Sequence, residues 1–215
     1  MQTNFTLAQL ADPDTARSEQ ILRKCVHCGF CTATCPTFVL LGDERDSPRG
    51  RIYFIKAMLE GDRAPTVQEV RHVDRCLSCL SCMTTCPSGV HYMHLVDHAR
   101  HHIEKTHQRP WFDRVLRQVL GTVLSRPGLF RIALLFAGLG KPLAPLLPAR
   151  LRAMLALAPT SLQNPTPLPT DKPARPIKRV ALLPGCAQQV LQPSINDATV
   201  RVLARHGCEV TVLPG

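Results

Sequence analysis

The chain has 215 residues, enough for one or two domains, and its hydrophobic fraction of 45% is ordinary for a globular protein. Its formal net charge is +10, and a chain this basic is a candidate to bind nucleic acid or an acidic surface. The Lys and Arg residues are scattered, however, and with 5% aromatic residues the sequence offers no platform for stacking bases. We therefore expect no nucleic-acid partner. A basic surface that docks an acidic protein or anionic lipid headgroups is favoured.

The amino-terminal segment MQTNFTLAQLADPDTARSEQ is polar and lacks the apolar core of a signal peptide. The sequence therefore indicates a cytoplasmic protein, and disulfide bonds would not persist in that reducing compartment. Residues 14–24 have the pattern of a short helix, which leads directly into the first of two cysteine runs.

Eight of the ten cysteines form two runs with one spacing, C-x2-C-x2-C-x3-C-P, and the second run repeats the first 51 positions later. The runs are Cys25, Cys28, Cys31 and Cys35 before Pro36, and Cys76, Cys79, Cys82 and Cys86 before Pro87. This spacing is that of two 4Fe–4S clusters, in which three cysteines of a run ligate one cluster and the fourth ligates the other. The expected ligand sets are therefore crossed: Cys25, Cys28, Cys31 and Cys86 for the first cluster, and Cys76, Cys79, Cys82 and Cys35 for the second. Two linked redox centres indicate an electron carrier.

A structural zinc site is the main alternative for so many closely spaced cysteines. Zinc is closed by four nitrogen or sulfur ligands, usually supplied as two separated CxxC pairs, whereas this chain has two complete quartets with trailing prolines. A zinc-stabilised interaction or nucleic-acid module would also be colourless and would contain no sulfide. A disulfide framework is less favoured still, because the chain is long and lacks a secretory signal.

Two helices are expected between the cysteine runs. Ser47 can cap a helix that opens at Pro48, with Ile52, Ile55 and Leu59 at helical spacing and Gly61 near its end. Thr66 and Glu69 form the pattern of a capping box, and Val70, Val73 and Leu77 follow on one side of the second helix. Since helices rather than hairpins separate the runs, we expect an α-helical ferredoxin-type domain over residues 1–108.

A further helix is expected from about His91 to Thr106, with an apolar stripe made by Tyr92, Val96, Ala99 and Ile103. Five histidines lie on another face: His91, His94, His98, His101 and His102. Their spacing would permit a metal site or proton relay, but no carboxylate or cysteine completes the face. A surface that faces water is the favoured interpretation.

Residues 109–158 form an apolar helical region. An amphipathic helix is expected over 110–124, followed by the run LFRIALLFAGLG at 129–140, which is too short and too interrupted to span a bilayer. This region is interpreted as a buried helical hairpin, a partner-docking surface or a shallow membrane contact, with burial against protein favoured. Residues 159–176 hold six prolines and are expected to form an extended linker.

The last segment, 177–215, has the pattern of one βαβ unit. Strands are expected at 179–183 and 209–213, with a helix over 195–205, and such a unit implies a parallel sheet. Two strands and one helix cannot bury their own faces, so either the chain is a fragment of a longer protein or these residues dock on something else, and the fragment is favoured. The predicted fold class is therefore mainly α, with an incomplete α/β domain at the end.

The two cysteine runs, the SPRGR segment Ser47–Arg51 and the LLPGC segment Leu182–Cys186 occur in one recognisable arrangement. This arrangement resembles the iron–sulfur subunit of glycolate oxidase, also called glycolate dehydrogenase. The wider group includes the iron–sulfur subunits of lactate utilisation, anaerobic glycerol-3-phosphate dehydrogenase and heterodisulfide reductase. These families continue with a cysteine-rich α/β domain that bears a Cys-Cys-Gly signature, and the resemblance implies that residues 177–215 are the start of that domain. Cys186 matches the leading cysteine of its first repeat, whereas the adjoining cysteine pair is expected just past Gly215 and is absent from this sequence. Cys186 is therefore a candidate second redox site or, equally, a small buried residue.

The resemblance implies a subunit of an oxidoreductase that does no substrate chemistry itself. A partner subunit with bound FAD would oxidise glycolate to glyoxylate, and electrons would pass through the two clusters to a quinone or another acceptor. The sequence itself holds neither a G-x-G-x-x-G motif nor a P-loop, so FAD would lie on the partner. The alternative is the equivalent subunit of a lactate or glycerol-3-phosphate dehydrogenase or of a heterodisulfide-reductase-like complex. A cytoplasmic location is expected, with peripheral contact to the inner membrane left open.

Overall fold

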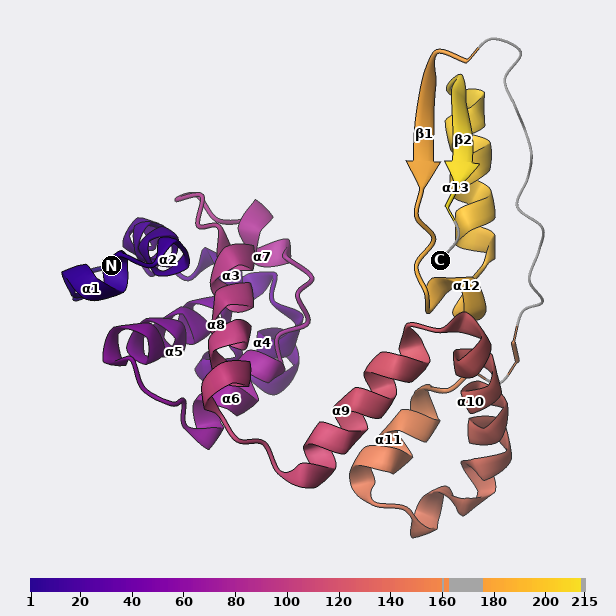
Figure 1. Ribbon diagram of the computed structural model, residues 1–215, viewed down its shortest axis with the longest axis horizontal. Coiled ribbons are helices and arrows are strands. Elements are labelled where there is room, and N and C mark those ends of the chain that lie inside the picture. Colours follow the sequence, from indigo (N-terminus) through magenta and orange to yellow (C-terminus); the bar gives the residue numbers. More distant parts are fainter. Residues whose placement is uncertain (160, 163–175, 214–215) are drawn as a thin grey trace. The chain divides into compact units, whose positions relative to one another are not determined.

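The computed structural model describes residues 1–159, 161–162 and 176–213. It divides into two units, residues 1–109 and 110–215, which are described separately. Both are built mainly from helices, and the described strands lie near the carboxyl end (Figure 1). The linker expected over residues 159–176 falls mostly outside the described residues.

The first unit consists of short helices joined by the two cysteine loops. Its elements are α1 (Leu7–Leu10), α2 (Pro13–Lys24), α3 (Phe30–Ala33), α4 (Pro36–Leu41), the 3-10 helix η1 (Glu44–Asp46), α5 (Pro48–Gly61), α6 (Val67–Asp74), α7 (Ser81–Thr84) and α8 (Tyr92–Thr106). The caps expected from the sequence are present, because Ser47 Oγ accepts from Gly50 N at 2.9 Å and Thr66 with Glu69 forms a capping box. The prediction for Leu77 was wrong: α6 ends at Asp74, and Leu77 is exposed as the chain turns into the second cysteine loop.

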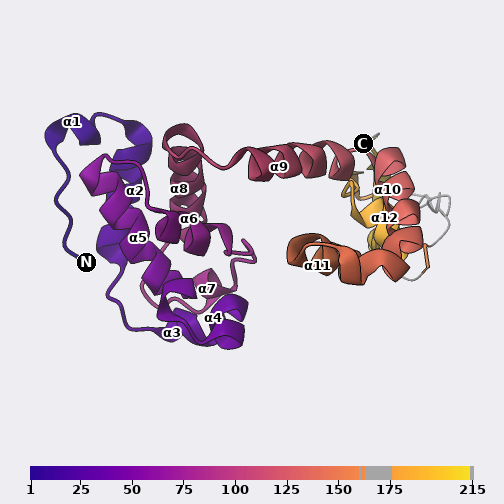
Figure 2. The same ribbon diagram turned by 90° about the horizontal axis from the view of Figure 1, so that it is seen from below.

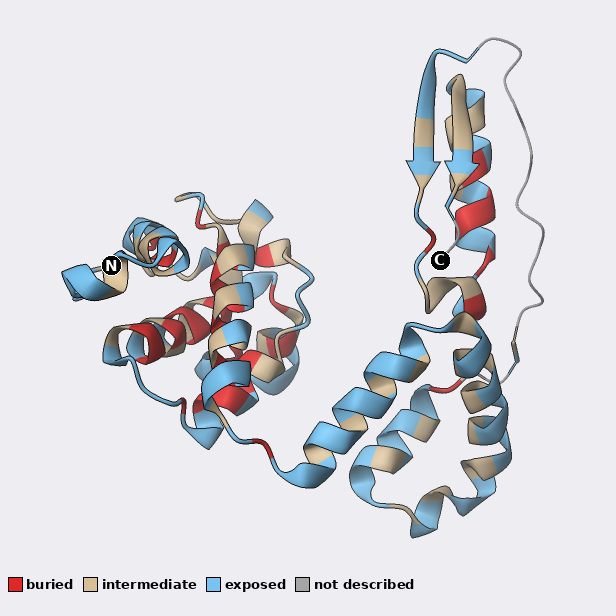
Figure 3. Ribbon diagram, in the orientation of Figure 1, coloured by how far each residue is buried: buried red, intermediate tan, exposed pale blue. Residues whose placement is uncertain are grey.

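The core of this unit lies where α2, α5, α6 and α8 pack together (Figure 2). Buried residues recur along both α5 and α8 (Figure 3). The apolar stripe expected on α8 is buried along its whole length, and Leu95 joins it. The four-helix core therefore holds both cysteine loops from one side.

The histidines of α8 contact separate partners instead of gathering into one site. His94 Nε2 lies 3.4 Å from the carbonyl oxygen of Asp14, and His102 Nε2 lies 3.0 Å from that of Arg63. His98 differs from the expected water-facing surface, because it is half-buried against α2 with Nδ1 2.7 Å from Ser18 Oγ. Burial lowers the pKa of His98 below its ordinary value.

The second unit begins with four helical segments: α9 (Trp111–Leu124), α10 (Pro127–Gly140), the 3-10 helix η2 (Lys141–Leu146) and α11 (Ala149–Leu157). An apolar cavity of about 500 Å³ lies between them, lined by side chains such as Phe130, Leu134 and Leu151. Residues on α9, α10 and α11 are exposed or intermediate rather than buried (Figure 3). The favoured expectation that residues 129–140 are buried against protein is therefore not met within this unit.

The apolar run is also longer than the sequence pattern indicated. Helix α10 begins at Pro127 and continues directly into η2, which gives one helical run of 20 residues, Pro127–Leu146. By length and composition alone, this run is long and apolar enough to cross a membrane, and none of it is buried. The prediction that the segment is too short to span was therefore wrong, because it left out the residues on both sides of 129–140.

The end of the chain forms the expected βαβ unit. Strands β1 (Lys178–Leu182) and β2 (Cys208–Val212) pair in parallel, with register Lys178↔Cys208. Helices α12 (Gln188–Leu191) and α13 (Ser194–Arg205) lie between them in the chain. Gly207, with φ of +76°, allows the turn from α13 into β2. The fold class predicted from the sequence is confirmed: mainly helical, with a small α/β segment at the end.

Candidate metal centres

The two cysteine loops have the same backbone course, so the sequence repeat is also a structural repeat. In the first loop His27 and Gly29 have positive φ angles of +53° and +86°, and α3 follows. In the second loop the counterparts 51 positions later, Ser78 and Leu80, have φ of +51° and +59°, and α7 follows. The repeats also touch, since Thr85 Oγ1 donates to Thr34 Oγ1, its own counterpart, at 3.3 Å.

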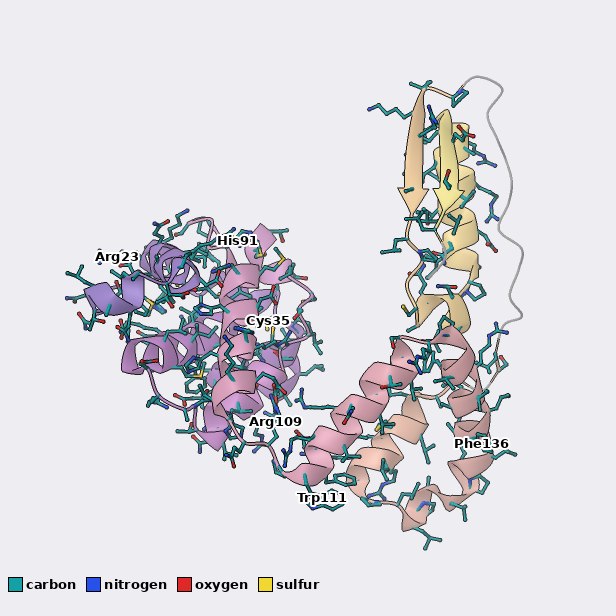
Figure 4. The ribbon with its side chains drawn as sticks, in the orientation of Figure 1. Arg23, Cys35, His91, Arg109, Trp111 and Phe136 are labelled. Carbon is teal, nitrogen blue, oxygen red and sulfur yellow. The ribbon has the colours of Figure 1, made fainter. Side chains whose placement is uncertain are left out.

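The eight cysteines line two neighbouring cavities. Cys25, Cys28 and Cys31 line the first together with Cys86, and Cys82 also reaches it. Cys76, Cys79 and Cys82 line the second together with Cys35. Each cavity thus has three cysteines of one run and the fourth cysteine of the other. Cys35 lies within the first unit (Figure 4) and is buried, whereas Cys28 and Cys79 are exposed at the edges.

The chemistry of these side chains fits a cluster that is bound by thiolates. None of the eight cysteines is in a disulfide bond in the described structure, and burial raises the pKa of Cys31 and raises that of Cys82 to about 12. Buried thiols of this kind ionise when a metal cation supplies the compensating charge. His27 lines the first cavity with both ring nitrogens buried and without a hydrogen-bond partner in the described structure. A cluster sulfur would give such a nitrogen an acceptor.

Two arginines of the SPRGR segment approach the cysteines from α5. Arg49 Nη1 donates to the carbonyl oxygen of His27 at 3.4 Å, and a Cβ on Gly29 would lie 2.7 Å from that same nitrogen. The positive φ favours glycine here without requiring it, since its counterpart Leu80 also has a positive φ, and the close approach of Arg49 is the further reason for Gly29. Arg51 is buried, with Nη1 3.8 Å from Cys35 Sγ. Neither role was assigned from the sequence, where SPRGR entered only as part of the resemblance.

Asp46 is the centre of a buried ion-pair network behind Cys35. Its carboxylate accepts from Arg51 Nη2 at 3.4 Å and from Arg75 Nη1 at 2.7 Å, and it lies 2.9 Å from His72 Nδ1. Burial alone would raise the pKa of Asp46, but the hydrogen bonds from His72 and Arg75 hold it below its ordinary value. Asp43, Asp46 and His72 are close enough to hold a metal ion. Because arginines already pair with both carboxylates, we interpret the group as a salt-bridge network.

The remaining two cysteines lie apart from this site, in the second unit. Cys186 is half-buried in the turn after β1, and Cys208 is the first residue of β2. The parallel register places Cys208 opposite Lys178, at the other end of the strand pair from Cys186. Cys186 and Cys208 therefore do not form a dithiol pair.

Comparison with known proteins agrees with the chemistry of the two cavities. Residues 24–90 match the 4Fe-4S dicluster domain family. This part of the chain is a two-cluster ferredoxin domain. Its cofactors are two 4Fe–4S clusters, as the cysteine spacing predicted. No solved structure matches the chain.

Two relatives match over the whole chain. The glycolate oxidase iron–sulfur subunit of Escherichia coli is 49% identical over 214 residues, and the probable glycolate oxidase iron–sulfur subunit of Bacillus subtilis is 32% identical over 234 residues. A ferredoxin:CoB-CoM heterodisulfide reductase subunit from Methanosarcina acetivorans is 36% identical over 38% of the chain. The resemblance to glycolate oxidase iron–sulfur subunits is thus confirmed along the chain. The chain spans about half the length of the two glycolate oxidase relatives.

Proposed function

We propose that this chain is the electron-transfer part of a flavin-dependent glycolate dehydrogenase complex. A partner subunit with FAD oxidises glycolate, and the electrons pass through the two clusters to a quinone or another acceptor. When bound, each 4Fe–4S cluster takes up and releases one electron at a time. The chain itself carries out no chemistry on the substrate. The name of the relative that is 49% identical supports glycolate as the substrate.

The observation that carries the proposal is the pair of adjoining cavities, each of which has three cysteines of one run and the fourth cysteine of the other, with Cys82 reaching both. This arrangement supports crossed ligation, with Cys25, Cys28, Cys31 and Cys86 at the first centre and Cys76, Cys79, Cys82 and Cys35 at the second. Crossed ligands hold the two centres close together, as electron hopping requires. The exposed edges at Cys28 and Cys79 give each centre one approach from solvent or from a partner.

The experiment that tests the relay uses the chain loaded with clusters under anaerobic conditions. Reduced FAD, standing in for the partner flavin, is expected to bleach the brown colour of the clusters. A soluble quinone added afterwards is expected to restore that colour. A brown protein that reduced flavin does not bleach would contradict the proposal, because the clusters would then be structural only. A colourless protein that contains zinc and no sulfide would support the zinc alternative.

The equivalent subunit of a related complex stays as the second candidate. The 36% identity to a heterodisulfide reductase subunit supports it, but this match covers only 38% of the chain. A catalytic role in such a related complex would need the cysteine-rich domain. We propose that this domain begins at residue 177 and contains Cys186. The ferredoxin-type domain, residues 1–108, would serve as a relay in either complex. The apolar helical region 109–158 and the linker 159–176 would join it to that domain.

We also propose that the complex lies in the cytoplasm and contacts the inner membrane peripherally through residues 110–158. This region holds seven Lys and Arg residues against one acidic residue, Asp113. Its helices expose large apolar side chains, and Phe136 projects away from α10 with 69% of its surface exposed (Figure 4). Apolar side chains flanked by cations are typical of helices that bind anionic lipid surfaces.

A further inference from the structure

The two cluster centres are nearly equivalent in backbone but differ in the charges that approach them. Cys35, the fourth ligand of the second centre, has Arg51 Nη1 at 3.8 Å and Thr37 Oγ1 at 3.2 Å from its Sγ. Cys86, its counterpart at the first centre, accepts from the backbone N–H of Val90 at 3.5 Å. In the described part of the chain, no side-chain cation donates to Cys86. The structural repeat is therefore broken at the fourth ligand.

Arg51 is held in place by a complete set of buried partners. Its Nε donates to the carbonyl oxygen of His72 at 2.6 Å, and its Nη2 donates to Thr37 Oγ1 at 3.0 Å. Only 1% of its surface is exposed. Because His72 of α6 and Thr37 in the first turn of α4 both accept hydrogen bonds from the guanidinium group, that group cannot turn away from the second cavity. Arg51 lines this cavity.

The charge of Arg51 is incompletely neutralised by its surroundings. The fully buried carboxylate of Asp46 is shared between Arg51 and Arg75, so the two cations and one anion keep a net positive charge. Arg100 adds a third cation to the second loop, where it donates to the carbonyl oxygen of Cys76 at 2.6 Å. Arg51 alone among these three cations is fully buried, and its charge acts on nearby groups with little screening, whereas Arg75 is 33% exposed and Arg100 is partly buried.

The cations near the first centre are more open to solvent. Arg49 is 35% exposed and pairs with Glu44, which carries one opposing charge for it alone. The amino terminus of Met1 donates to backbone carbonyl oxygens, including that of Cys25 at 2.6 Å, and Met1 is only partly buried. Because water and counterions screen these groups, each of them stabilises a negative charge added to the nearby cluster less than a buried cation would.

Reduction adds one negative charge to a cluster, so hydrogen bonds and positive charge at its ligands raise its reduction potential. Each centre also has an uncharged side chain in reach: Tyr92 Oη donates to Cys76 Sγ at 3.7 Å at the second centre, and the unpartnered ring of His27 lines the first cavity. We infer that Arg51, assisted by Tyr92, gives the centre bound by Cys35, Cys76, Cys79 and Cys82 the higher reduction potential of the two. Resting on the proposed function, this inference sets the direction of the relay. With both clusters bound, an electron from the partner flavin that reaches the first centre would pass to the oxidised second centre, and no bond or proton would change.

The test is a reductive titration of the full chain with both clusters, followed by EPR, in which two one-electron steps are resolved. Arg51→Met is expected to lower the reduction potential of the higher-potential step by at least about 59 mV, which is a tenfold change in its equilibrium constant. The potential of the lower-potential step is expected to stay unchanged. Arg49→Gln is expected to do the reverse and lower only the lower step. Arg51→Lys keeps the charge and is expected to restore part of the shift, which a purely structural role would not predict.

Movement of the lower step in Arg51→Met, or of neither step, would overturn the inference. If Arg51→Met does not retain about eight irons, Tyr92→Phe takes its place, because it removes one donor to Cys76 and leaves the ion-pair network intact. A smaller downward shift confined to the higher step is then expected, and no shift would overturn the inference. These outcomes leave the relay itself standing, since iron content and reduction by flavin are measured separately.

Discussion

At the scale of single residues, two glycines with left-handed backbones allow the effect of backbone strain to be measured apart from the effect of a close contact. Gly29 and Gly42 have φ of +86° and +65°, but only at Gly29 would a Cβ meet another atom, Arg49 Nη1 at 2.7 Å. Gly42→Ala is expected to cost about 1 kcal/mol from its backbone alone, and Gly29→Ala clearly more because Arg49 must also move. Urea unfolding of both variants measures this difference. Equal losses would show that Arg49 yields without cost.

The roles of the arginines show what could not be predicted at this scale. The three leading cysteines of each run were proposed as ligands from local spacing, because a cluster must be reached by a short loop. Arg51 lies 16 positions after Cys35 and 21 before His72, and its burial exists only once α5 has packed against α6. A charged residue at helical spacing is ordinarily on the surface, so nothing local marked it as buried.

At the scale of helices, the cap of α5 should matter more than that of a peripheral helix. Ser47 is fully buried, accepts from Gly50 N and donates to Glu44 Oε1 at 2.9 Å. Ser47→Ala is expected to reduce the free energy of unfolding by about 1–2 kcal/mol, since it leaves a buried donor unpaired. Thr6→Ala, at the exposed cap of the four-residue helix α1, is the matched control and should cost less. A larger loss in Thr6→Ala would contradict this ranking.

The packing of α8 against α2 should make stability depend on pH. Burial lowers the pKa of His98 from its ordinary value of 6.5, so the unfolded chain binds this proton more readily than the folded one. The stabilising contribution is therefore present above pH 6.5 and is lost as the pH falls through the folded pKa.

His98→Asn is expected to reduce the fall in the free energy of unfolding between about pH 7 and pH 5. The exposed His101 on the same helix provides the control, because His101→Asn should leave that fall unchanged. An unaltered pH dependence in His98→Asn would show that burial of this imidazole does not govern the titration.

At the scale of the whole molecule, the net positive charge of the chain comes almost entirely from residues 110–215. Residues 1–109 hold thirteen Lys and Arg against twelve Asp and Glu, whereas residues 110–215 hold thirteen against four. The interpretation that basic residues are scattered along the chain therefore missed the difference in net charge between these two parts. The segment with the charge is also the one that exposes the apolar run Pro127–Leu146.

This combination predicts binding to vesicles that contain anionic lipid. Phe136→Asp is expected to weaken that binding about tenfold, because one aromatic side chain no longer enters the apolar layer. Leu7→Asp, which changes an even more exposed apolar residue in the first unit, is the control and should have no effect. Sedimentation with vesicles of increasing anionic content measures both variants. Binding that is unchanged in Phe136→Asp would assign the apolar face to a protein partner.

The general plan of the chain could be predicted because its signals are local: helix caps, cysteine spacing and alternating strands. What surrounds residues 127–146 could not be predicted, because the spacing of apolar residues in a helix is the same whether protein or lipid covers it. The length of that run was also misjudged, because the helix begins at Pro127 and the helical run continues to Leu146, beyond residues 129–140 on both sides.

The central claim is that the two cysteine runs exchange their fourth ligands. Replacing Cys76, Cys79 and Cys82 with alanine should leave a single centre of about four irons, bound by the first run and Cys86. In that background we expect Cys35→Ala to keep the iron content, and Cys86→Ala to convert the centre to a three-iron form or lose it. Iron analysis with EPR measures this directly. Loss of the centre in Cys35→Ala, with Cys86→Ala harmless, would contradict the account.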